Sequence, residues 1–392
     1  MTKAHLAAIR VQTVICMRTL GPILLLVFGG PLLEGSSVFS QATTAITHTS
    51  GVGDLGTRTI SQGQTTQITG GTRTDQGSGT NLFHSFDQFS VGDGHTAKFL
   101  NTTPSLHTDN ILSRVTGGDS SGIFGTIDTT SYPGANFFLM NPGGIVFGPN
   151  ATLQVGGSVA FTTADYLRLA GADASNAGIF HADLSATPQL SSAPVAAFGF
   201  LGDNPAAIKV NETTLPLDPG QTFSLVGGNI TIQSSMLADA ADTAAGNQVF
   251  IASVASPGDI LVGTLASAPN INSELPKTLG TIDISQGSTI DTSNRDGGSI
   301  HIRGGQLIVD GSNIFAGSGG ILLNGTSISI KNSATFGTYT ITTANAGNVV
   351  LQASRDIVVD SNSRVESQTF SASRDAGNIT LRSQQGKHYS LQ

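Results

Sequence analysis

The chain has 392 residues, of which 11% are charged and 49 are glycine, and its net charge is −8. The charged fraction is far below the roughly 25% that is usual in soluble domains. Valine, isoleucine and leucine recur at strand spacing through most of the sequence, which argues against a disordered chain.

The first forty residues have the order of a secretory signal peptide. Lys3, Arg10 and Arg18 precede the apolar run Leu20–Phe28, and small residues follow it. We expect cleavage after Ser40. The apolar run is too short to span a bilayer as a stable helix, and no later stretch resembles a membrane span. The mature chain is therefore expected to be exported, either secreted or held at the cell surface.

Cys16 is the single cysteine and precedes the apolar run, whereas a lipid-attachment cysteine would follow it. The mature chain would then have no disulfide, which suits a bacterial protein that stays threadable while it crosses a further membrane. Without residues 1–40 the chain keeps 15 basic and 25 acidic residues, a net charge of −10. This acidic balance argues against a nucleic-acid partner.

Downstream of residue 40, short alternating runs predict half-buried strands, and no sustained helical period is found. Such runs include "NITIQS" from Asn229 and "GNVVLQAS" from Gly347. Four similar runs are separated by intervals of 21, 28 and 30 residues, and they start at Ile300, Ile321, Val349 and Ile379. Unequal intervals between similar units are typical of a solenoid whose turns vary in length.

Two architectures are compatible with these runs. Turn dipeptides such as Asp310-Gly311 and Asn324-Gly325 also occur in a meander of β-hairpins. Continuous apolar clusters and the near-repetition of whole strand-turn-strand units favour stacked parallel coils. We therefore predict an all-β parallel β-helix.

The ends of such a stack are unpaired sheet edges that need cover. Residues 41–100 are a candidate N-terminal cap, because the phenylalanine-rich stretch Thr80–Gly94 breaks the repeat. The C-terminal "LRSQQGKHYSLQ" shows no comparable cap, and we therefore expect the chain to be a truncated or shortened member of its type.

The stretch Asn141–Phe161 illustrates the predicted coil. Three short β-type runs are separated only by glycine, proline and asparagine, and together they make about one coil in 21 residues. Pro142 fixes φ, the two following glycines accept conformations that a side chain forbids, and Asn141 can hydrogen-bond its own backbone. We expect a tight turn at residues 141–144.

Three separate blocks closely resemble the secretion domain of two-partner secretion exoproteins, the filamentous-haemagglutinin N-terminal or haemagglutination-activity domain. The blocks are "NLFHSFDQFSV" from Asn81, "NILSRVTGGDSSGIFGTI" from Asn110 and "FFLMNPGGIVFGPNATLQVGGSVAFTTADYL" from Phe137. The resemblance implies a right-handed parallel β-helix with an N-terminal β cap. It also implies a signal peptide over 1–40, a secretion domain over 41–205 and a continuing β-helical repeat region over 206–392.

The resemblance further implies a secreted surface protein of the adhesin or haemagglutinin type. Its partner would be an outer-membrane barrel transporter with periplasmic POTRA domains, and its ligand a glycan or protein on a host or neighbouring cell.

The family's Asn-Pro-Asn-Gly-Ile motif corresponds here to Asn141, Pro142, Gly143, Gly144 and Ile145, with glycine at the third position. We consider two roles for it, shaping the turn or contacting the transporter directly. The family's second motif, Asn-Pro-Asn-Leu, has no clean counterpart. The stretch "NTTPSL", with Asn101, Pro104 and Leu106, lies in about the right place.

The alternative function is that of a parallel β-helix lyase or hydrolase acting on polysaccharides. That chemistry needs carboxylates or basic residues clustered on adjacent coils. The candidate carboxylates are instead spread among turns, and they are Asp283, Asp291, Asp296 and Asp310. The histidines lack metal-ligand spacing. We expect no catalytic residue, no metal and no cofactor.

Six Asn-x-Thr sequons are present, as expected by chance in a chain this rich in threonine and asparagine. They begin at Asn101, Asn150, Asn211, Asn229, Asn324 and Asn378.

Overall fold

The computed structural model describes residues 43–171, 178–238, 246–261, 278–293, 298–340, 344–360, 362–370 and 374–384. All of them belong to one compact unit, Ser40–Gln392. The predicted signal peptide, Cys16, Asp296, His388 and the last eight residues lie outside the described residues.

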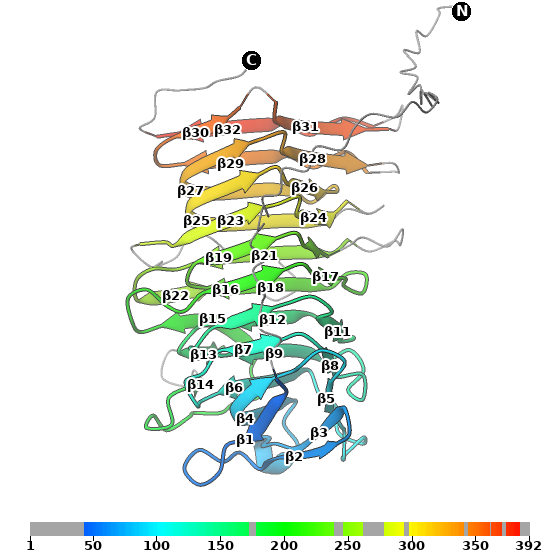
Figure 1. Ribbon diagram of the computed structural model, residues 1–392, viewed down its shortest axis with the longest axis vertical. Helices are drawn as coiled ribbons and strands as arrows, with labels where there is room; N and C mark the ends of the chain where they lie inside the picture. The colour runs from blue at the N-terminus through cyan, green and yellow to red at the C-terminus, as the bar shows by residue number, and fades with distance from the viewer. Residues whose placement is uncertain are drawn as a thin grey trace, which may run out of the picture. The chain divides into compact units, whose positions relative to one another are not determined.

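The strands stack as the coils of a parallel β-helix with three faces, which we call A, B and C (Figure 1). Face A contains β4 (Asn81–Ser90), β6 (Asn110–Val115), β9 (Asn136–Met140), β12 (Val159–Thr162), β18 (Thr222–Gly227), β21 (Gln248–Ser253), β29 (Val349–Ala353) and β32 (Ile379–Ser383). Face B contains β7 (Ser121–Ile123), β10 (Ile145–Phe147), β16 (Ile208–Asn211), β19 (Ile230–Gln233), β23 (Thr281–Ser285) and β30 (Ile357–Val359). The long strands β25 (Ser299–Asp310) and β27 (Gly320–Lys331) contribute to both faces.

Face C is formed by two separate ladders. The first contains β3 (Thr65–Gly70), β5 (Thr96–Phe99), β8 (Thr126–Asp128) and β11 (Thr152–Gln154). The second contains β17 (Thr214–Leu215), β20 (Met236–Leu237), β24 (Thr289–Thr292), β26 (Asn313–Ala316), β28 (Thr335–Thr340) and β31 (Arg364–Thr369).

The register confirms the parallel stack. Ile300 pairs with Ile321, Ile321 with Val349, and Val349 with Ile379, so the four similar runs start at equivalent positions of successive coils. Neighbouring strands within each of the three faces are parallel, and the hairpin meander is therefore wrong. The predicted coil at residues 141–161 is also confirmed, since β12 returns to lie on β9 with Val159 opposite Phe137.

The interior of the column changes character along the chain. Phenylalanines fill the first coils, with ring centroids 5.3 Å apart for Phe99 and Phe137 and 4.8 Å apart for Phe147 and Phe161. Later coils are filled largely by aliphatic residues such as Ile300 and Leu323, both fully buried or nearly so. Aliphatic residues, many of them β-branched, suit this parallel stack because side chains of similar shape lie over one another in successive coils, as with Ile300, Ile321 and Val349.

The N-terminal cap is confirmed, but with a different boundary. β1 (Ala45–His48) pairs antiparallel with β4, and β2 (Thr57–Gln62) pairs antiparallel with β3, so these strands close the end of the column. The phenylalanine-rich stretch Thr80–Gly94 was expected to belong to the cap and does not. It contains β4, which runs parallel to β6 in direct register and is the first strand of the first coil.

A second sheet covers the outside of face A. It contains β13 (Tyr166–Leu169), β14 (Ile179–His181), β15 (Val195–Phe200) and β22 (Gly258–Leu261), all antiparallel. The chain leaves the column after β12 and again after β21 to form it. Phe83 and Phe138 point outward from face A and pack beneath it in a second hydrophobic core. The continuous apolar runs of face A thus reflect burial on both sides.

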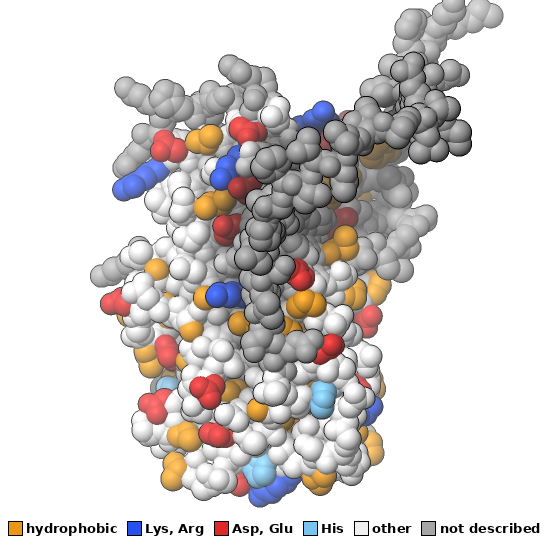
Figure 2. Space-filling model, viewed as in Figure 1, with side chains coloured by type: hydrophobic (Ala, Val, Ile, Leu, Met, Phe, Trp, Pro, Cys, Tyr) orange, Lys and Arg blue, Asp and Glu red, His pale blue; other side chains and the backbone are white. Residues whose placement is uncertain are grey.

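The surface carries few charges. Figure 2 shows acidic and basic side chains scattered singly among polar, uncharged atoms on the face in view. The described residues contain no helix with the length and apolar character of a membrane-spanning segment.

Candidate functional site

The turn that follows β9 is built around the side chain of Asn141, which is fully buried. Its Nδ2 donates to the carbonyl oxygen of Asp119 and to Ser121 Oγ, both at 2.9 Å. Its Oδ1 accepts the backbone N–H of Gly143 at 2.8 Å. The amide therefore joins its own turn to the corresponding turn of the preceding coil.

The two glycines of this turn are required for different reasons. Gly144 has φ of 110°, which side-chain-bearing residues rarely adopt. Gly143 lies against the preceding coil, and a Cβ there would come within 2.5 Å of the Gly118 carbonyl oxygen. Pro142 and Gly143 are the partly exposed members, whereas Ile145 is buried in the core.

The segment with Asn101, Pro104 and Leu106 forms an exposed turn between β5 and β6. Asn101 Oδ1 accepts the N–H of Thr103 at 2.9 Å, and Leu106 N–H donates to the Thr103 carbonyl at 2.9 Å. This turn precedes a face A strand, and the turn at residues 141–144 follows one. The structure therefore places the two predicted motif regions at opposite ends of the face A strands and does not bring them together.

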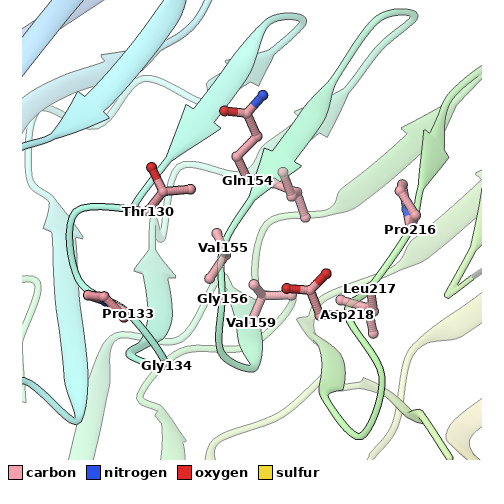
Figure 3. A pocket seen from close by; sticks show the side chains of 11 residues that line it. Thr130, Pro133, Gly134, Gln154, Val155, Gly156, Val159, Pro216, Leu217 and Asp218 are labelled. Carbon is pink, nitrogen blue, oxygen red and sulfur yellow. The ribbon is translucent and has the colours of Figure 1, made fainter. Parts of the chain in front are cut away.

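A groove opens where the two ladders of face C fail to join. The groove has a volume of about 470 Å³ and lies between the end of β11 and the residues that follow β17. Figure 3 shows Pro133 and Gly134 on one side, Val155 in the middle, and Leu217 and Asp218 on the other side. Faces A and B stay paired across the same coils, since β9 pairs with β12 and β10 pairs with β16.

Arg114 is a buried cation that fastens three parts of the fold together. Its Nε donates to Ser85 Oγ at 2.9 Å, one terminal nitrogen donates to the His181 carbonyl at 2.5 Å, and the other donates to the Gly53 carbonyl at 3.0 Å. The guanidinium carbon lies 5.2 Å from the centroid of the Phe180 ring. Burial lowers the pKa of Arg114 to about 10, still far above neutral pH, so the group remains charged. Coil, cap loop and outer sheet are thus tied to one side chain.

His84 is buried inside the first coil, beneath the cap. Its Nδ1 is hydrogen-bonded to Thr57 Oγ1 at 3.2 Å, and its Nε2 has no partner among the described residues. Burial, with a smaller contribution from the Arg73 cation, lowers the pKa of His84 to about 3. The folded protein therefore holds this ring in the neutral form.

This burial predicts an acid-sensitive cap. Above pH 6.5 both folded and unfolded chains carry neutral His84. As the pH falls below 6.5 the unfolded chain takes up a proton that the folded chain refuses until about pH 3, so stability falls with pH. The expected loss is about 2 kcal/mol between pH 7 and pH 5. Urea denaturation of the His84→Leu protein should show a correspondingly weaker dependence on pH, and an unchanged dependence would contradict the assignment.

The candidate carboxylates are not gathered on one surface. Asp283 lies on face B, Asp291 lies on face C and Asp310 ends β25. Among the described residues no group of three or more histidine, cysteine, aspartate or glutamate side chains is placed to hold a metal ion.

The roles of Arg114 and His84 and the presence of the outer sheet do not follow from the sequence patterns described above. The signal in the sequence is the alternation of each strand. In β4 the alternation gives His84 an interior position, and in β6 it gives Arg114 an outward position. An outward arginine is ordinarily solvated, and this one is buried because the outer sheet and the cap loop cover it.

The family described as "TPS secretion domain" matches residues 45–302 of the chain. No curated protein sequence matches it. Among solved structures the chain is similar to one described as the crystal structure of the HMW1 secretion domain from Haemophilus influenzae. The two share 14% identity with a TM-score of 0.46, over 88% of this chain and 100% of that one.

Proposed function

The chain belongs to the family of two-partner secretion exoproteins, and we propose that a partner barrel transporter with POTRA domains carries it across the outer membrane. Outside the cell it acts as a surface adhesin. The observation that carries this proposal is the match of the TPS secretion domain over residues 45–302, which includes the cap, the first coils and the outer sheet.

The architecture supports export of an unfolded chain that folds as it emerges. Most neighbouring coils pair residues that are close in sequence, as with Val159 on Phe137 or Ile321 on Ile300. Each coil added presents a strand edge to the next one. Coil-by-coil burial outside the cell would then bias movement of the chain outward without ATP.

The outer sheet is the exception to this local order. Ile145 pairs with Ile208 and Val159 pairs with Phe223, because the chain forms β13, β14 and β15 before it returns to the column. Closing so long an excursion is slower than adding a simple coil. We expect this part of the domain to complete its fold later than the first coils.

We propose that Asn141, Pro142, Gly143, Gly144 and Ile145 act in secretion by shaping the turn. Asn141 supports this role because its amide is buried and uses its hydrogen bonds within the fold. We assign no separate secretion role to Asn101, Pro104 and Leu106.

Export is tested by producing the full chain in a host with and without a co-expressed outer-membrane barrel transporter that carries POTRA domains. We expect the protein in the medium only when the transporter is present, and in the periplasm otherwise. Deleting the cap, residues 45–70, should retain the chain in the periplasm, whereas deleting the last described coil, residues 357–384, should leave export intact. Equal release with and without the transporter would refute the proposal.

A further inference from the structure

A cavity of about 240 Å³ lies at the corner where the chain passes from face C to face A. The corners of three successive levels contribute to its lining, because they follow β3, β5 and β8, which are stacked in one parallel ladder (Figure 1). Arg73 comes from the first corner, Thr102 and Thr103 come from the second, and Tyr132 comes from the third.

Arg73 is the single charged residue among the described residues that line this cavity. Its Nη1 donates to the carbonyl oxygens of Gly79 at 2.9 Å and of His107 at 3.3 Å, and its Nη2 donates to Thr108 Oγ1 at 2.5 Å. A guanidinium has five N–H donors, so these three bonds leave two donors without a partner in the described part of the chain.

The positive charge of Arg73 has no carboxylate partner within the described residues. Its three acceptors are neutral oxygens, two from peptide carbonyls and one from a hydroxyl. Partial burial lowers the pKa of Arg73, and the group stays charged at neutral pH. The whole chain has a net charge of −8, so this cavity carries the charge opposite to that of the chain. A partly buried cation of this kind favours an anionic ligand, because the ligand supplies the counter-charge.

The second corner adds uncharged donors to the cavity. Thr102 and Thr103 are both exposed, and their hydroxyls make no hydrogen bond to another described residue. Their turn is fixed from within, since Asn101 Oδ1 accepts the Thr103 N–H at 2.9 Å. Tyr132 is fixed as well, because its Oη donates to the Leu100 carbonyl oxygen at 3.1 Å. The lining groups are therefore in place before a ligand binds, which limits the entropy lost on binding.

This set of donors suits a small oxyanion. A guanidinium can donate to two oxygens of one phosphate or sulfate, and hydroxyl groups can donate to the remaining oxygens. We propose that this cavity binds a small oxyanion of the phosphate or sulfate type, held by Arg73 and by the hydroxyls of Thr102 and Thr103. The bound ion joins three corners of the column. It stabilises the N-terminal coils, because it binds the folded chain and not the unfolded one.

The inference depends neither on the transporter nor on an adhesive ligand. The test titrates the purified full chain with sodium phosphate by calorimetry, with sodium chloride of equal ionic strength as the reference. We expect one site with a dissociation constant of about 1 mM. Arg73→Met should weaken binding about tenfold, since it removes the charge and both unpartnered donors. The matched control is Arg58→Met, an exposed arginine of the cap that pairs with Asp54, and it should leave binding unchanged.

A second variant separates binding from folding, because Arg73 also bonds two carbonyl oxygens of the fold. Combined Thr102→Val and Thr103→Val substitutions keep the side-chain shape at exposed positions and remove only the hydroxyls. They should weaken phosphate binding about threefold. Phosphate should also raise the urea midpoint of the unsubstituted chain more than that of the Arg73→Met protein, a comparison that removes the general stabilisation by phosphate.

Vesicles that contain phosphatidylglycerol distinguish a lipid headgroup from a free ion. Vesicle binding that inorganic phosphate competes away supports the site with a headgroup as its source, and phosphate binding without vesicle binding supports it with the free ion. The absence of heat beyond the chloride reference at about 20 mM phosphate would overturn the inference. An equal loss of binding in the Arg58→Met protein would overturn it as well.

Discussion

Replacing Arg114 with methionine should lower the free energy of unfolding by about 3–5 kcal/mol. Methionine keeps the apolar stem but removes all three donors, so the Gly53 and His181 carbonyl oxygens lose their hydrogen bonds from a charged group in a buried place. A buried acceptor left without a partner costs more than the bond itself contributed. Burying the charged guanidinium costs free energy, as its lowered pKa reflects, and methionine avoids that cost. The net loss of stability is therefore smaller than the summed contributions of the three hydrogen bonds.

The loss of stability in the Arg114→Met protein should be concentrated near the substituted residue. A solenoid's stability is a sum of coil and interface contributions, so hydrogen exchange after the substitution should accelerate in β14 and in the cap loop near Gly53. The control is Arg58→Met, an arginine whose side chain is 54% exposed and whose ion pair with Asp54 spans 3.2 Å. An exposed pair of this kind contributes less than about 1 kcal/mol. Equal losses in the two proteins would show that Arg114 is not the fastening residue.

The column could be predicted from the sequence because the patterns that specify it lie within short segments of the chain. Each strand alternates inward and outward residues, glycines and turn dipeptides mark the corners, and successive coils repeat. The intervals between Ile300, Ile321, Val349 and Ile379 matched the register of the stack for that reason. The tight turn at residues 141–144 was equally accessible, since proline, glycine and asparagine each restrict the backbone in a known way.

The outer sheet could not be predicted in this way. β13, β14 and β15 alternate as any strand does, and β22 joins them from a segment some sixty residues further along the chain. The contacts that hold β22 in this sheet are tertiary: Asp259 on β22 accepts hydrogen bonds from two side chains of β13, Tyr166 Oη at 2.7 Å and Arg168 Nε at 2.9 Å, across β15. Pairing of distant segments leaves no periodic mark in one sequence.

The boundary of the cap was misjudged for a related reason. Phenylalanines in Thr80–Gly94 differ from the aliphatic residues of later coils, and this difference predicts a structure other than the repeat. The fold shows instead that the first coils use aromatic residues for the same interior positions, with Phe86 and Phe89 packed 5.0 Å apart between ring centroids. Side-chain type varied along the column while the strand path did not.

Asn141→Ala should lower the free energy of unfolding by about 2–4 kcal/mol, because it removes three side-chain hydrogen bonds from a fully buried position. Pro142→Ala is the matched control in the same turn. Proline restricts mainly the unfolded chain, and its loss should cost at most about 1 kcal/mol. Urea denaturation of the purified domains measures both.

Combining this measurement with export separates the two roles of the turn. If the turn acts through its shape, Asn141→Ala should lose stability and export together, and Gly143→Asn should do the same although it restores the residue of the family motif. The reason is the close approach of the preceding coil, whose Gly118 carbonyl oxygen would lie 2.5 Å from a Cβ at position 143. An Asn141→Ala domain of undiminished stability that fails to be exported would instead mean that the transporter contacts this side chain before the coil has folded.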